Sequence, residues 1–81
     1  MLRDIILETT ETEALEFTIS YWKVDPGAAV HEGDELLVVE SVEDKTALAV
    51  ISRYTGTLAE ILAQEDSTVA PGDRLGRIDA E

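Results

Sequence analysis

A seven-residue pattern that occurs twice constrains the fold of this 81-residue chain more than any other feature. Residues 30–36 and residues 69–75 share the signature V-x-x-G-D-x-L at an offset of 39 positions. The similarity extends backwards at the same offset, because Thr18 falls on Thr57 and Ile19 falls on Leu58. The chain therefore consists of two similar halves.

The signature is typical of a strand end, a tight turn and a new strand. Gly33 and Gly72 supply the positive φ that other residues resist, while the Val and Leu anchor the turn to the core. The following residues, Asp34 and Asp73, can accept hydrogen bonds from nearby backbone amides. We interpret both Gly-Asp pairs as structural turns and not as a metal site.

Most of the remaining chain has an apolar period near two, which predicts short strands. For example, the apolar residues of segment 15–21 alternate with polar ones, and no segment shows a sustained helical stripe. We expect strands near residues 2–8, 14–22, 29–31, 36–41, 46–51, 56–63, 68–70 and 75–79. We expect breaks at Pro26-Gly27, Gly33, Asp44-Lys45, Gly56, Asp66 and Pro71-Gly72.

Two similar halves of about four strands each predict a single all-β domain over residues 1–81. The expected architecture is a flattened two-fold barrel or sandwich of two four-stranded antiparallel sheets, whose halves share one core and protect each other's edges. The segment 40–46 joins the halves and has no counterpart in the second half. This hairpin should protrude at one end.

The charge and composition of the chain narrow its partners. Six Lys and Arg against 18 Asp and Glu give a net charge of −12, so nucleic acid and membrane surfaces are poor partners, whereas basic protein surfaces are favoured. There is no cysteine, and acidic residues interrupt the N-terminal segment before any long apolar run. We expect a cytoplasmic protein that is a monomer in isolation.

Several segments together resemble the lipoyl-attachment domains of 2-oxo acid dehydrogenase acyltransferases, which are related to biotinyl domains and to the glycine-cleavage H protein. The resemblance rests on residues 22–24, on the turn ending at Leu36, on Val39-Glu40, on Asp44-Lys45, on Gly56 and on residues 69–78. It covers nearly the whole chain, and the Asp-Lys pair between the two halves is its specific element.

The resemblance implies that Lys45 carries lipoate as an amide and that the attaching enzyme recognises Asp44. The chain would then be a swinging-arm carrier without catalytic residues, and its expected cofactor is lipoate. Its expected partners are a lipoate ligase or lipoyl transferase, a 2-oxo acid dehydrogenase and dihydrolipoyl dehydrogenase. Such a lysine must lie at an exposed turn, since its group has to visit distant active sites.

The connecting hairpin departs from the usual family pattern, Glu-Thr-Asp-Lys-Ala, by two extra residues between Glu40 and Lys45. Counting back from Gly56 selects Lys45, whereas counting forward from Gly33 places Glu43 at the lysine position. One alternative function is therefore an unmodified interaction module. A biotinyl carrier is less favoured, because that family flanks its lysine with methionines and Met1 is the only methionine here.

Other chemistry-bearing residues give weaker signals. Lys23 follows Trp22 in a predicted strand, so it is a poor attachment site, and Trp22 itself is expected to fill the core. His31, the only histidine, lies in an acidic turn without a second metal ligand, and we interpret it as a solvated turn residue. We assign no catalytic residue and no metal site.

Overall fold

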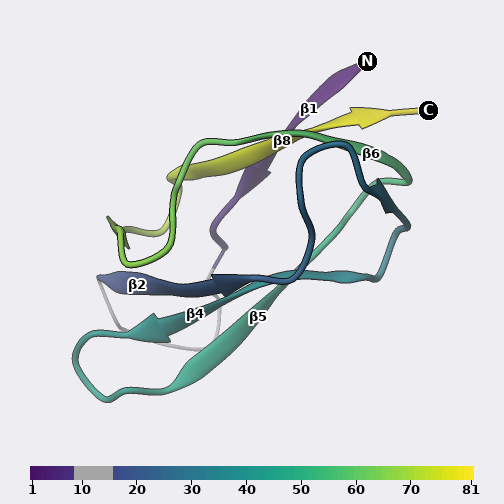
Figure 1. Ribbon diagram of the computed structural model, residues 1–81. Coiled ribbons are helices and arrows are strands. Elements are labelled where there is room, and N and C mark those ends of the chain that lie inside the picture. The colour runs from purple at the N-terminus through teal and green to yellow at the C-terminus, as the bar shows by residue number, and fades with distance from the viewer. Residues whose placement is uncertain (9–15) are drawn as a thin grey trace.

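The computed structural model describes residues 1–8 and 16–81, which form two antiparallel sheets packed face to face (Figure 1). The strands are Leu2–Ile6 (β1), Phe17–Trp22 (β2), Ala29–Val30 (β3), Glu35–Ser41 (β4), Ala47–Ile51 (β5), Gly56–Ile61 (β6), Thr68–Val69 (β7) and Arg74–Ala80 (β8). Sheet A has the strand order β1-β8-β6-β3, and sheet B has the order β5-β4-β2-β7. The predicted two-sheet, all-β architecture is confirmed.

Each of the eight expected strands is present in the described part of the chain, with small differences at the ends. The expected strand 2–8 ends at Ile6, because Ile6 pairs with Arg74, the first residue of β8. The expected strand 56–63 ends at Ile61. Residues 14 and 15 of the expected strand 14–22 lie outside the described residues. Within the described part, no helix is long and apolar enough to cross a membrane.

Each sheet contains strands from both halves of the chain, and backbone hydrogen bonds between the halves are exchanged reciprocally. The Gly27 amide donates to the Leu58 carbonyl at 2.7 Å, and the Asp66 amide donates to the Ile19 carbonyl at 2.8 Å. Since Gly27 and Asp66, like Ile19 and Leu58, are related by the repeat offset, these are the same bond made twice. The internal repeat is therefore a structural two-fold relation.

The two Gly-Asp turns follow the same relation. Gly33 and Gly72 have φ angles of 96° and 95°, in the left-handed region. The Asp34 carboxylate accepts a hydrogen bond from the His31 amide at 2.9 Å. Asp73 makes the corresponding bond with the Ala70 amide at 2.8 Å. The sequence-based interpretation of these residues as structural turns is confirmed.

The core lies between the two sheets and takes side chains from both halves. Its largest fully buried members are Phe17, Leu7, Ile19, Leu36, Leu37, Leu58, Leu75, Ile78, Val30 and Val39. Trp22 packs against this core and donates its indole N–H to the Ala63 carbonyl at 2.8 Å. The expected core role of Trp22 is confirmed, and its hydrogen bond links the two halves.

Gly56 is the first residue of β6, where the expected strand 56–63 begins, so the break expected here is the boundary between the β5–β6 turn and the strand. A Cβ atom placed on Gly56 would lie 2.1 Å from the Asp79 carbonyl oxygen and 2.9 Å from the Ala80 Cα. The glycine is required because the backbones of β6 and β8 approach closely here, which is a known use of glycine within strands.

We expect the substitution Gly56→Ala to destabilise the fold by at least about 3 kcal/mol, because backbone atoms and not a flexible side chain would have to move. Urea unfolding followed by tryptophan fluorescence measures this loss. The neighbouring exposed Thr57→Ala is the control and should cost under about 1 kcal/mol. A Gly56→Ala protein as stable as the control would contradict the close strand contact.

Candidate functional site

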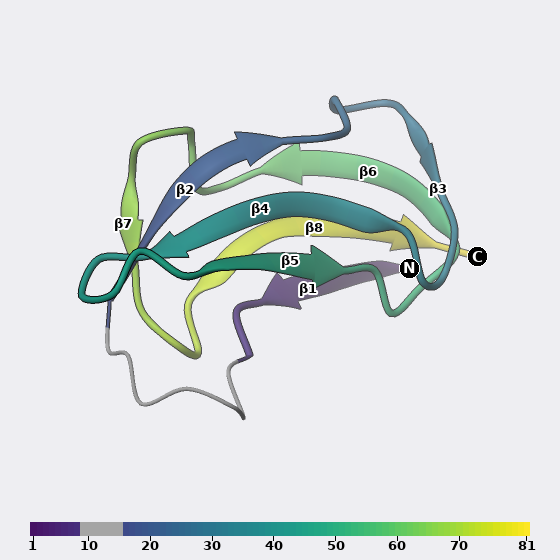
Figure 2. The same cartoon turned by 90° about the horizontal axis from the view of Figure 1, so that it is seen from below.

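The β4–β5 turn connects the two halves and projects beyond the sheets at the end of the molecule opposite to the chain termini (Figure 2). The turn consists of the four residues 42–45, which lie between Ser41 and Thr46. The Ser41 amide donates to the Thr46 carbonyl at 2.8 Å, and the Lys45 amide donates to the Ser41 carbonyl at 2.9 Å. The backbone hydrogen bonds between β4 and β5 therefore continue as far as Ser41 and Thr46, and the chain then reverses direction in one tight turn.

Lys45 occupies the last position of this turn and has a φ angle of 63°. Its amide bonds to the carbonyl four residues earlier, which is the arrangement of a helical turn closed by a left-handed residue. Glycine is usual at such a position, because a residue with a Cβ atom is conformationally strained in the left-handed region. The Lys45 side chain is exposed, and its ammonium makes no ion pair with any residue that the structure describes.

Two polar side chains hold the turn. The Asp44 carboxylate accepts a hydrogen bond from the Thr46 amide at 3.0 Å, while the Ser41 hydroxyl accepts a long bond from the Asp44 amide at 3.5 Å. The Thr46 amide, with further hydrogen bonds from the hydroxyls of Thr46 and Ser41, lowers the pKa of Asp44 below its ordinary value. Asp44 therefore contributes to the turn as a carboxylate.

Ser41 was not identified as a site residue in the sequence, although it is almost fully buried, with 1% exposure. The sequence contains one indication of this role: Ser41 is a polar residue at an inward-facing position, two residues after the buried Val39 of the same strand. A buried hydroxyl normally requires a partner. The hydrogen bonds between Ser41 and Asp44 supply one.

Lys23, the other lysine of the chain, lies in a different environment. It follows the end of β2, and its ammonium lies 3.2 Å from the Glu35 carboxylate. The side chain is about one-third exposed. Lys23 is therefore held against sheet B by an ion pair, whereas Lys45 is presented on a projecting turn.

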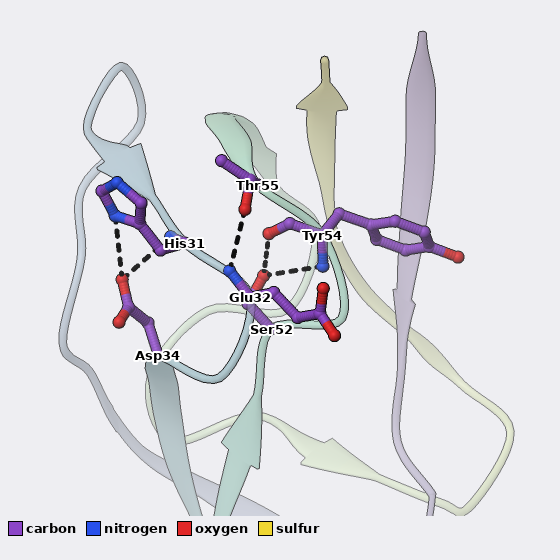
Figure 3. A network of polar contacts seen from close by, with 6 residues as sticks. All are labelled: His31, Glu32, Asp34, Ser52, Tyr54 and Thr55. Carbon is purple, nitrogen blue, oxygen red and sulfur yellow. Dashed lines mark hydrogen bonds and ion pairs between the residues drawn. The ribbon is translucent and has the colours of Figure 1, made fainter.

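His31 lies at the opposite end of the sandwich from Lys45, in the network that joins the β3–β4 and β5–β6 turns (Figure 3). Its ring Nδ1 is 3.7 Å from the Asp34 carboxylate, and the side chain is 74% exposed. The Glu32 amide donates to the Thr55 hydroxyl at 3.1 Å in the same network. His31 is thus a solvated turn residue, as its sequence context predicts.

A cavity of about 210 Å³ lies away from Lys45, and residues 4–6, Glu8 and residues 51–54 form most of its lining. Arg53 forms an ion pair with Glu8 beside it. The cavity is smaller than the range of about 300–1,000 Å³ that is typical of small-molecule sites. No residue of the β4–β5 turn lines it. Among the described residues, no group of His, Cys, Asp and Glu is arranged to hold a metal ion.

The chain is similar to known proteins over most of its length. A family model named Biotin_lipoyl and described as a biotin-requiring enzyme matches residues 9–78. The lipoamide acyltransferase component of a branched-chain alpha-keto acid dehydrogenase complex from Bacillus subtilis is 36% identical over 82% of this chain. The dihydrolipoyllysine-residue succinyltransferase component of a 2-oxoglutarate dehydrogenase complex from Azotobacter vinelandii is 31% identical over 96% of this chain.

These relatives are much longer than the chain, which spans 15% of the first and 19% of the second. A solved structure matches the whole fold instead. It is the solution structure of the lipoyl domain of the 2-oxoglutarate dehydrogenase complex from Azotobacter vinelandii, with a TM-score of 0.73 and 29% identity. The match covers 96% of this chain and 98% of that one.

The lowered pKa of Asp44 gives a testable pH dependence. Because the folded-state pKa lies below 3.8, the carboxylate stabilises the turn above that pH and loses this effect as the pH falls through the lowered pKa. The amide chemical shift of Thr46, followed by NMR, should titrate with a midpoint below 3.8. Asp44→Asn should abolish the transition, and a midpoint at or above 3.8 in the unsubstituted protein would contradict the hydrogen bonding.

Proposed function

Because the chain belongs to the family of biotin- and lipoyl-attachment domains, we propose that it is a carrier domain bearing lipoate in amide linkage on Lys45. The observation that carries this proposal is the placement of Lys45 on the projecting turn that joins the two halves. The proposal gives the chain no reaction of its own. Its part is to present the group attached to one lysine to several enzymes in turn.

The environment of Lys45 suits the attachment reaction. To form the amide, the deprotonated amine attacks the carbonyl carbon of an activated lipoyl group, the activating group leaves, and the nitrogen loses its remaining extra proton. The Lys45 side chain is exposed on the turn and has no ion-pair partner among the described residues, so an activated acyl group can approach its nitrogen. The nitrogen of Lys23 is instead in contact with the Glu35 carboxylate.

The position of Lys45 also suits transport between active sites. Once attached, the lipoyl group supplies a dithiolane that can accept an acyl group and two electrons. The turn holds the base of the arm at the end of the sandwich, where the sheets cannot obstruct it (Figure 2). Tethering raises the effective concentration of the carried group at each enzyme that the domain visits.

The names of the relatives support the wider setting. Two of them are acyltransferase components of 2-oxo acid dehydrogenase complexes. We therefore propose that this chain exchanges acyl groups and electrons with a 2-oxo acid dehydrogenase, an acyltransferase and dihydrolipoyl dehydrogenase. Attachment would be performed by a lipoate ligase or by a lipoyl transferase.

The length of the turn favours one alternative, an unmodified interaction module. The usual family pattern Glu-Thr-Asp-Lys-Ala leaves two residues fewer between glutamate and lysine than are present between Glu40 and Lys45. Enzymes that modify a side chain depend on its orientation to within fractions of an ångström. Two additional residues before Lys45 therefore change how the turn presents the lysine.

The attachment proposal is tested by the intact mass of the protein after incubation with ATP, lipoate and a lipoate ligase. We expect one lipoyl adduct on the unsubstituted protein and on Lys23→Arg, and none on Lys45→Arg. Lys23→Arg is the matched control because these are the two lysines of the chain. A parallel incubation with biotin, ATP and a biotin ligase tests the biotinyl alternative.

A deletion of residues 42 and 43 makes a negative result informative, because it produces Glu-Ser-Asp-Lys-Thr with the usual family spacing and keeps the strand register in phase. If the deletion variant is lipoylated and the unsubstituted protein is not, the longer turn prevents attachment and the interaction module is the better account. An adduct retained by Lys45→Arg would contradict the assignment of the site.

A further inference from the structure

Under the two-fold relation, the outer face of sheet A corresponds to the outer face of sheet B. On sheet A, one row of this face consists entirely of charged side chains. Glu60 of β6, Arg77 of β8 and Asp4 of β1 are cross-strand neighbours. The Arg77 Nε lies 3.3 Å from the Asp4 carboxylate and 3.4 Å from the Glu60 carboxylate. Arg77 thus lies between two carboxylates, and its Nε is shielded from solvent and makes no hydrogen bond with a described residue.

The corresponding row on sheet B is apolar. Tyr21 and Val38 stand at the repeat offset from Glu60 and Arg77, and Ala49 holds the place in β5 that Asp4 holds in β1. Tyr21 pairs with Val38 across β2 and β4, and Val38 pairs with Ala49 across β4 and β5. We call Tyr21, Val38 and Ala49 the outer row.

The outer row is accessible in the described structure. Tyr21 is 47% exposed, Ala49 is exposed and Val38 is partly exposed. Ile51, which is 45% exposed, lies two residues after Ala49 and so points to the same face. An aromatic side chain within a small apolar strip is typical of the centre of a protein interface.

We propose that the outer row docks the enzyme that attaches lipoate to Lys45, an inference that rests on the proposed function. The row belongs to sheet B, whose strands β4 and β5 form the hairpin that carries Lys45. Ala49 is four residues after Lys45, which corresponds to about 13 Å along a strand. An enzyme seated on the row therefore has its active site within a short distance of the lysine.

The short reach of the unmodified lysine favours the attaching enzyme, and not the enzymes that act later, as the partner of the outer row. A bare lysine side chain is short, so the attaching enzyme has to approach the hairpin closely and its surface must overlie the adjoining part of sheet B. A dehydrogenase meets the carried group at the end of a longer arm and can remain farther away. The outer row is the apolar surface that the closer approach would cover.

The charges around the row define the chemistry of the partner. Glu40 lies on the same face between the row and the hairpin, where it is the cross-strand neighbour of Thr18 and Ala47. Asp44 follows in the turn itself. A surface with an apolar centre and Lys or Arg at its rim complements this arrangement. A second copy of the chain does not, since each copy carries a charge of −12.

Steady-state kinetics of lipoylation, with the domain concentration varied against ATP, lipoate and a lipoate ligase, test the proposal. The variant Tyr21→Glu, Val38→Arg, Ala49→Asp places the charged row of sheet A on sheet B. We expect it to raise KM for the domain at least about tenfold with kcat little changed, because ground-state docking is lost. The matched control is Ala59→Asp, which makes the same net charge change at an exposed position of β6 and should keep the original KM.

Tyr21→Ser provides a second variant if the triple substitution does not fold, and it should raise KM in the same direction. A KM within twofold of the original in the folded variants would overturn the docking site. Loss of self-association in the triple variant, with KM unchanged, would show by sedimentation that the row binds a second copy instead, and would also overturn it. An unsubstituted protein that no lipoate ligase modifies would refute the proposed function, and the docking with it.

Discussion

The reciprocal exchange of hydrogen bonds between the two halves is the constraint on which the rest of the structure depends. The loop after β2 bonds to Leu58 of β6, and the corresponding loop after β6 bonds to Ile19 of β2. Neither half completes a sheet alone, because sheet A and sheet B each take two strands from each half. The 81-residue chain thereby gains one core shared by both halves, which a half-length fragment could not build.

This constraint also separates the hairpin from the scaffold. The two-fold relation assigns a structural task to nearly every other segment, but the β4–β5 turn serves only to connect the halves. Ser41 and Asp44 accept hydrogen bonds from residues that follow them in the turn, and one longer-range bond, from the Val42 amide to the Glu16 carbonyl at 3.1 Å, ties the turn to the start of β2. None of these bonds involves a core side chain other than Ser41, so a change in turn length acts mainly on how Lys45 is presented.

The sequence predicts the fold well because the repeat, the period-two pattern and the Gly-Asp turns are all local signals. Lys45 and Asp44 were predicted as site residues through the resemblance to lipoyl domains, because counting forward from Gly33 places Glu43 at the lysine position. The backbone conformation of Lys45 could not be predicted from the sequence, because it depends on how the four-residue turn closes onto Ser41. The role of Gly56 and the contrast between Glu60 and Tyr21 depend on contacts between strands distant in sequence, which the sequence pattern does not specify.

Native-state hydrogen exchange tests most directly whether the two halves form one cooperative frame from which the hairpin is separate. If the two halves form one frame, the amides of Ile19 and Leu58 exchange with the same free energy, equal to that of global unfolding. The amide of Lys45 should exchange through local opening at a clearly lower free energy, because its bond to Ser41 lies in an exposed turn. Unequal protection of Ile19 and Leu58, or a Lys45 amide as protected as either, would contradict this arrangement.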